Sequence, residues 1–337
     1  MIEPVLERPV LADPTTDLLV RLRPRAEREV LRSPVFLTVL LAALTVFIVM
    51  YGNILLAVLP GVFCLLNLGV LSYLWSLVRS SRRGAALLVD AYWRPTEVTV
   101  LRGSSISTDL STPSGALRVL GLSTAHRPVL RRTGRAWIVG PDSSGDAAVR
   151  IEGSFEAYPA VRLAKAPAPG PVPKAETTDP TLLWAKNLSA RAWLLASPAV
   201  GLLVGVLAFV ADVDLLVLLV ITLVVVLGLA LGQVKNLHRW IDRKLPRLVA
   251  AGGWVAAGAT LSPWTPRVDS SAETSVALRL DSGVVATVAL PNALTDLLGA
   301  IVDTGGVWVA GTIAPGNTVA VGFPGYPLVA AGTVLPG

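Results

Sequence analysis

From position 35 to position 78, 44 consecutive residues of this sequence carry no charged side chain. About 20 apolar residues cross the hydrocarbon core of a bilayer, so this stretch is too long for one membrane helix. The turn-forming cluster Tyr51-Gly52-Asn53 divides it near the middle. We therefore predict a membrane hairpin of two helices, at residues 35–50 and 54–78, with a kink at Pro60-Gly61.

A second apolar block runs from residue 192 to residue 234 and is interrupted only by Asp212 and Asp214. It predicts a second hairpin, with helices at residues 192–210 and 215–234. Glycines four residues apart let two helix backbones approach closely. We therefore expect four glycines of this hairpin to pack helices together, namely Gly201, Gly205, Gly228 and Gly232.

Basic residues flank the outer ends of both predicted hairpins, whereas the hairpin tips carry no positive charge. By the positive-inside rule, both termini and both long segments between the hairpins would then be cytoplasmic. The chain is 53% hydrophobic and 15% charged, which excludes an ordinary soluble domain and a disordered chain. Together with an excess of arginine over lysine, these features predict a multi-pass protein of a bacterial inner membrane. The flanking residues are Arg28, Arg32, Arg79, Arg82, Arg83, Lys186, Arg191, Lys235, Arg239, Arg243 and Lys244.

Short motifs recur in the same order in the two halves of the chain. Asp13-Pro14-Thr15 precedes the first apolar block, as Asp179-Pro180-Thr181 precedes the second. Trp93 and Trp264 are 171 residues apart, and so are Trp137 and Trp308, which indicates a match without a gap from one pair to the other. We predict a tandem duplication in which each copy is a hairpin followed by a β-rich module. The two copies would be related by a pseudo-twofold axis along the membrane normal.

Short alternating runs rich in Val, Thr, Gly and Pro follow each hairpin and predict a small β-barrel, OB-like as the first choice and PH-like as the second. The fold class is thus four membrane helices plus two cytoplasmic β modules. The expected division is a lead-in with an interfacial helix (residues 1–33), hairpin one (34–80), β module one (81–165), a Pro-rich linker (166–181), an interfacial segment with hairpin two (182–244), and β module two (245–337).

Catalysis has no support in the sequence. One cysteine, Cys64, and two histidines leave too few ligands for a Cys/His metal site. The Gly-rich phosphate-binding motifs and the nucleophile elbow are absent from the sequence. His126 is expected to be a solvated surface residue, and His238 an interfacial one. We predict a protein that is not an enzyme and uses no cofactor and no metal.

The two predicted modules differ in charge. Residues 81–165 contain 12 basic and 7 acidic side chains, and residues 246–337 contain 3 basic and 5 acidic ones. Part of the basic excess is clustered, and it forms either a patch for an anionic partner or a solvated face beside the membrane. The clustered residues are Arg127, Arg131, Arg132 and Arg135.

The absence of a catalytic set, together with two differently charged modules, favours a non-enzymatic scaffold or assembly subunit of a larger bacterial membrane complex. Its expected partners are the lipid bilayer and other membrane or cytoplasmic proteins; nucleic acid is not expected, and homo-oligomerisation is left open. One alternative is a small oligomeric transporter or channel. Another is a membrane-tethered sensor that binds anionic lipid or a nucleotide through the arginine cluster.

Overall fold

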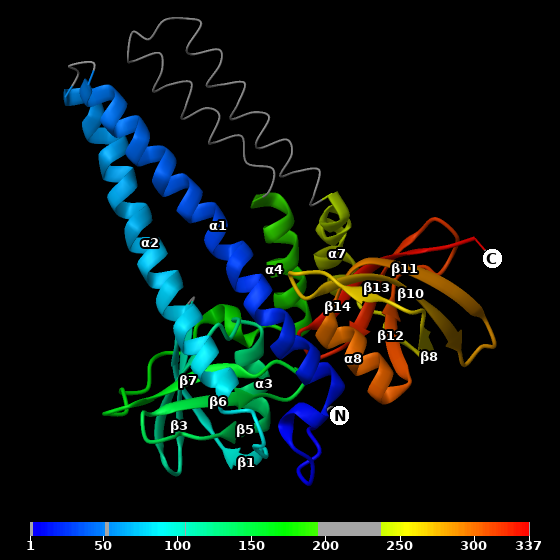
Figure 1. Ribbon diagram of the computed structural model, residues 1–337. Coiled ribbons are helices and arrows are strands. Elements are labelled where there is room, and N and C mark those ends of the chain that lie inside the picture. Colours follow the sequence, from blue (N-terminus) through cyan, green and yellow to red (C-terminus); the bar gives the residue numbers. More distant parts are fainter. Residues whose placement is uncertain (1–2, 51–53, 105, 195–236, 337) are drawn as a thin grey trace, which may run out of the picture.

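The computed structural model describes residues 3–50, 54–104, 106–194 and 237–336. A long helical hairpin projects from a β-rich body in which two β units lie side by side (Figure 1). We call residues 94–163 the first β unit and residues 255–334 the second β unit. The N-terminal segment lies where the two units meet.

The hairpin consists of α1 (Pro14–Met50) and α2 (Ile54–Ala86), and the 3-10 turn η1 (Val10–Ala12) precedes it. Asp13 begins α1, because its Oδ1 accepts hydrogen bonds from the backbone N–H groups of Thr15 (3.0 Å) and Thr16 (3.2 Å). Asn67 joins the two helices, since its Nδ2 donates to the Pro34 carbonyl (2.7 Å) and to Thr38 Oγ1 (2.6 Å). These hydrogen bonds between the two helices fix the register of α2 against α1.

The prediction of four membrane helices in two hairpins is wrong. Among the residues that the structure describes, one helix, Gly61–Ala86, is long and apolar enough to cross a membrane. Residues 35–50 are the second half of α1, whose first half carries eight charged side chains. A helix continues across a change in polarity as long as its backbone hydrogen bonds continue, so the charge-free stretch could not locate where this helix begins.

The prediction of a multi-pass protein of a bacterial inner membrane, with both termini cytoplasmic, rested on those four helices. It is wrong for the same reason, because one helix among the described residues is long and apolar enough to cross a membrane. The predicted helices at 192–210 and 215–234 lie outside the described residues, apart from residues 192–194. The same holds for the four glycines expected to pack them, Gly201, Gly205, Gly228 and Gly232.

The first β unit is an open antiparallel sheet with the strand order β1-β5-β6-β7-β4-β3-β2, which forms a half-barrel. One helix, α3, stands between the fourth and fifth strands, and ends at Gly134, which adopts φ 60° as a helix C-cap. Its elements are β1 (Arg94–Glu97), β2 (Thr99–Gly103), β3 (Ser107–Thr112), β4 (Gly115–Leu120), α3 (His126–Thr133), β5 (Arg135–Val139), β6 (Asp146–Arg150) and β7 (Tyr158–Leu163).

The second β unit has the same spatial order of strands, β8-β12-β13-β14-β11-β10-β9, but β10 also pairs with β8. This pairing closes six antiparallel strands into a barrel. The 3-10 helix η3 (Leu237–Lys244) and the helix α7 (Leu245–Ala251) precede this unit. Its elements are β8 (Val255–Leu261), β9 (Thr265–Pro266), β10 (Ser271–Leu280), β11 (Val285–Leu294), α8 (Thr295–Thr304), β12 (Gly306–Ala310), β13 (Thr318–Phe323) and β14 (Leu328–Val334). An OB-fold has five strands, so the first-choice OB-like barrel is wrong.

Strand register shows which residues of the two units are equivalent. Glu97 on β1 lies opposite Arg135, and Gly258 on β8 lies opposite Gly306. The counterpart of β1 is therefore β8, which lies ten residues nearer than a spacing of 171 would place it. The gap-free match of Trp93 with Trp264 is consequently wrong, whereas Trp137 and Trp308 occupy equivalent places on β5 and β12.

The Pro-rich segment after the first β unit packs against that unit. The backbone N–H of Gly170 donates to the Leu101 carbonyl on β2 at 2.8 Å. The segment then forms the 3-10 turn η2 (Lys174–Thr177) and leads into α4 (Pro180–Leu194), where Asp179 Oδ2 accepts from the Leu182 N–H. An extended backbone without internal hydrogen bonds can use the edge strand of the open sheet in this way.

Candidate functional site

The far half of the hairpin exposes a large apolar surface. Only 6% of the most apolar stretch of the helix Gly61–Ala86 is buried, and its mean hydropathy is 1.8. Leu65 and Leu66 on α2 and Phe36 on α1 are among the most exposed hydrophobic side chains of the described residues. An apolar surface of this extent is typical of a site that contacts another protein or a membrane.

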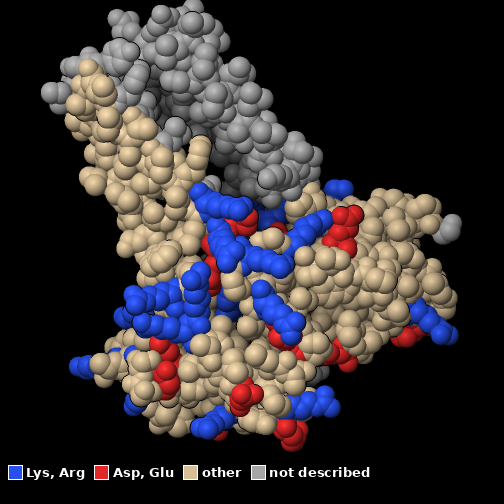
Figure 2. All heavy atoms as spheres, in the orientation of Figure 1, with Lys and Arg blue, Asp and Glu red and all other residues tan. Residues whose placement is uncertain are grey.

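Arginines cluster directly below that surface, on both helices. Eight arginines and three acidic residues lie between positions 17 and 83 of the hairpin, an excess of five positive charges. Lys and Arg side chains gather between the hairpin and the β body (Figure 2). We call these eight arginines the hairpin base: Arg21, Arg23, Arg25, Arg28, Arg32, Arg79, Arg82 and Arg83.

Some arginines of the hairpin base attach the helices to the first β unit. Arg23 donates to the Ala157 carbonyl at 2.7 Å, and Arg83 pairs with Asp146 at 3.5 Å. Arg82 pairs with Glu27 at 3.1 Å and so links α2 to α1. Arg28 and Arg79 are exposed, and they present their charge to the solvent at the level where the apolar surface begins.

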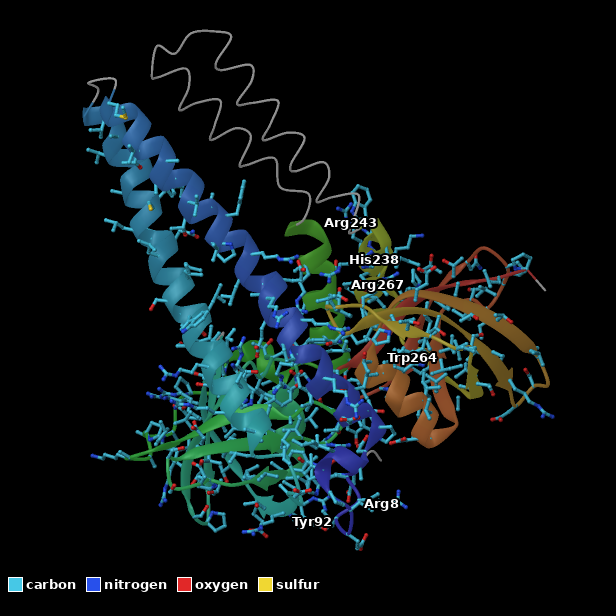
Figure 3. The ribbon with its side chains drawn as sticks, in the orientation of Figure 1. Arg8, Tyr92, His238, Arg243, Trp264 and Arg267 are labelled. Atoms are coloured by element: carbon cyan, nitrogen blue, oxygen red, sulfur yellow. The ribbon has the colours of Figure 1, made fainter. Side chains whose placement is uncertain are left out.

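Further basic residues lie beside α4, on the segment that precedes the second β unit. Figure 3 shows His238 and Arg243 on η3, at the end of the unit that faces α4. The Arg243 guanidinium stacks 4.2 Å from the centre of the Trp240 ring, and Arg191 lies 5.6 Å from that of Trp184. Aromatic stacking of this kind orients an arginine and leaves its charge in place.

The four arginines of the predicted anionic-partner patch do not lie together on the surface. Arg127 is 2% exposed, and its Nη1 pairs with Glu176 Oε1 at 2.9 Å. Arg131 pairs with the second carboxylate oxygen of the same Glu176. Because Glu176 belongs to η2, these two arginines hold the Pro-rich segment against α3.

The other two arginines of the set contact different parts of the chain. The Arg132 guanidinium lies 4.9 Å over the Tyr326 ring of the second β unit. Arg135 pairs with Glu3 of the N-terminal segment at 3.0 Å, and this pair is half exposed. The prediction that these four side chains form one exposed cationic patch is therefore wrong.

Replacing Arg127 with leucine is expected to lower the free energy of unfolding by about 3 kcal/mol, because it leaves the buried Glu176 carboxylate with Arg131 alone. The double replacement of Arg127 and Glu176 by leucine should recover most of this loss, since it removes both buried charges. Arg135→Leu is the matched control, whose exposed pair should contribute less than about 1 kcal/mol. Denaturant unfolding of the full chain in mild detergent measures all three. Equal effects of Arg127→Leu and Arg135→Leu would contradict the assignment.

His126 is buried, and the expectation of a solvated histidine is wrong. Burial lowers its pKa to about 3, so the imidazole is neutral near pH 7. Its Nδ1 hydrogen-bonds Ser123 Oγ at 2.7 Å, and its Nε2 the Tyr158 hydroxyl at 3.3 Å. The ring also packs edge-on against Trp184. Both ring nitrogens are thus used inside the protein, which makes this a structural centre.

The loop between β6 and β7 inserts into the second β unit. Phe155 is fully buried and belongs to the hydrophobic core of that unit. Its backbone N–H donates to Asp296 Oδ1 at 3.0 Å, and Ser154 Oγ donates to Asp296 Oδ2 at 2.8 Å. Arg150 ties the loop to the start of α1 through Asp13, at 2.8 Å. The two β units therefore share a core and a buried polar cluster.

The start of α1 touches the second β unit, and α4, which packs mainly on the second β unit, also touches the first. At the start of α1, Thr15 lies so close to α8 that a Cβ on Gly299 would be 2.6 Å from its Cγ2. At the start of α4, Trp184 packs on His126 of α3, with ring centres 5.7 Å apart. These contacts hold the hairpin and both units in one arrangement.

No group of three or more His, Cys, Asp or Glu side chains in the described part of the chain is arranged to hold a metal ion. No protein-family model matches the chain, and neither a curated protein nor a solved structure gives a match.

Proposed function

We propose that this protein is a non-enzymatic scaffold that binds a lipid bilayer through the exposed hairpin and docks other proteins with its two β units. The observation that carries the proposal is the apolar surface of α1 and α2 lying directly beyond the arginines of the hairpin base. Apolar side chains enter the hydrocarbon region, and arginines interact with the phosphate headgroups beside it.

The rigid connection between the two β units supports the proposed docking of other proteins. A scaffold must hold its docking surfaces in a fixed relation to the membrane. The shared core at Phe155, the Asp296 cluster and the contact of the start of α1 with α8 supply that rigidity. The Ser123–His126 pair has the residue types of a catalytic dyad, but the His126 imidazole is buried and both of its nitrogens are hydrogen-bonded, so the proposal gives it no catalytic role.

The full chain should float with vesicles, and it should bind vesicles with anionic lipid more tightly than vesicles of phosphatidylcholine alone. The double variant Arg28→Gln, Arg79→Gln should bind anionic vesicles roughly 30-fold more weakly, because each arginine near the surface contributes about 1 kcal/mol. Flotation assays at several salt concentrations measure the effect, which salt should reduce.

Arg279→Gln is the matched control, because Arg279 is exposed on β10, away from the hairpin. It should leave vesicle binding unchanged. No flotation at all would remove the bilayer from the proposal, and equal binding to neutral and anionic vesicles would remove the role of the arginines.

A further inference from the structure

A cleft of about 600 Å³ opens on the outside of the second β unit. Its walls come from β8, β12 and the turn between β13 and β14, and its side chains are mostly apolar or aromatic. Asp281 carries the charge among its lining residues. The main lining residues are Ala256, Gly258, Trp308, Phe323, Pro324 and Tyr326.

Trp308 forms the floor of the cleft and points away from the barrel core. Its neighbours on β12, Val307 and Val309, point inward and are buried in that core. Trp308 is 38% exposed, and its ring contacts the Phe323 ring edge-on with centres 5.4 Å apart. The Tyr326 hydroxyl is held by a 2.6 Å hydrogen bond to Glu152, so this wall of the cleft is fixed by the first β unit.

The equivalent tryptophan of the first β unit is covered. Trp137 on β5 occupies the place of Trp308, yet it is 3% exposed. Val10 and Leu11 of the N-terminal segment pack over it, together with Leu88. The Val10 N–H donates to the Ala91 carbonyl at 2.8 Å and fixes the segment in place. The outer face around this tryptophan is thus filled in the first unit and open in the second.

We propose that the Trp308 cleft binds a short segment of a partner protein that has a basic residue, a proline and two aliphatic residues in sequence. The stretch Arg8-Pro9-Val10-Leu11, whose Val10 and Leu11 cover Trp137, has this chemistry. Val and Leu side chains on Trp308 would bury an exposed aromatic ring, and proline lowers the entropy lost on binding. The basic residue complements Asp281 at the cleft, in a unit with 3 basic and 5 acidic side chains. This inference rests on the proposed docking function and names its site.

The probe is a fluorescein-labelled peptide with the sequence of residues 4–12, titrated into the full chain in mild detergent and followed by fluorescence anisotropy. Saturable binding is expected. Trp308→Ala should weaken it at least tenfold, Trp308→Phe should weaken it less, and Asp281→Asn should weaken it several-fold. A peptide with serine at the positions of Val10 and Leu11 should not bind. Trp240→Ala, at a tryptophan of similar exposure on η3, should leave binding unchanged.

Three outcomes would overturn the inference. The first is no saturable binding of the peptide to a wild-type chain that still floats with vesicles, which separates this failure from that of the proposed function. The second is peptide binding that Trp308→Ala does not weaken. The peptide would then displace the N-terminal segment of the chain from Trp137 and would not bind in the Trp308 cleft. The third is self-association of the chain that Trp308→Ala abolishes, which makes a second copy the occupant.

Discussion

Replacing Phe155 with alanine is expected to lower the free energy of unfolding by about 3–5 kcal/mol, the range measured for buried Phe→Ala substitutions. Phe155 belongs to a loop of the first β unit, but its side chain lies in the core of the second, beside Leu297 on α8. The Arg150 guanidinium also lies 4.7 Å over its ring. The substitution therefore leaves a cavity and removes an apolar contact that joins the two units.

Thermal unfolding of the full chain in mild detergent measures this effect, and the midpoint should fall by on the order of 10 °C. Phe36→Ala is the matched control, because Phe36 is 69% exposed on the hairpin. Its unfolding midpoint should stay within about 2 °C of the wild type. If the two variants unfold at the same temperature, Phe155 does not couple the units.

The interlocked units bear on how a scaffold of this kind would work. A loop of the first unit enters the core of the second, the start of α1 touches α8, and α4 packs on the second unit while Trp184 contacts His126 of the first. Force or binding energy applied at the Trp308 cleft would then reach the hairpin through packed side chains. We expect the β body to move as one piece relative to a membrane.

Features that depend on residues close together in the sequence, such as turns and helix ends, could be located from the sequence. The charge-free stretch led to a hairpin, and Tyr51-Gly52-Asn53 lies where α1 and α2 are separated. The motifs Asp13-Pro14-Thr15 and Asp179-Pro180-Thr181, used only as markers of a repeat, both begin helices in which the aspartate accepts backbone N–H groups. Gly134 and Gly305, 171 residues apart, both end helices in the left-handed conformation. The tandem duplication itself stays a prediction.

Burial by distant partners could not be predicted. Arg127 and His126 read as surface residues, because a charged or polar side chain near other arginines is usually solvated. Their partners, Glu176 and Trp184, are some 50 residues further along and reach α3 only when the Pro-rich segment folds back. The Trp93 match failed for a related reason, since strand register and not residue spacing decides equivalence. The exposure of Trp308 and the burial of Trp137 could not be predicted either, because they depend on where the N-terminal turn η1 packs.

The stability of Asp296→Asn relative to the wild type is expected to increase as the pH rises from 4 to 7. Burial, together with the negative charge of Glu156, raises the pKa of Asp296 to about 7 from an ordinary value of 3.8. Between these values the folded wild type binds a proton that the unfolded chain does not. Its stabilising contribution is therefore complete below pH 3.8 and is lost as the pH rises through 7.

Asparagine keeps the hydrogen bonds to Ser154 and Phe155 without titrating, so the difference in unfolding free energy should grow by about 1.4 kcal/mol per pH unit, to about 4 kcal/mol at pH 7. The difference isolates Asp296 from other groups that titrate in this range. His126, with its pKa lowered to about 3, opposes Asp296, and Asp242, with its pKa raised to about 7 by burial, adds to it. His126 and Asp242 contribute equally to the stability of the variant and of the wild type, so their contributions cancel in the difference.

Denaturant unfolding of the full chain at pH 4, 5, 6 and 7 measures the slope. Asp109→Asn is the control, because at Asp109 the effect of burial is outweighed by hydrogen bonds from Arg118 and Arg102, which lower its pKa. Its titration lies below pH 4, so the difference from the wild type should be constant across the range. An equally constant difference for Asp296→Asn would mean that the carboxylate between the two β units is ionised at pH 4, and that the junction is open to water.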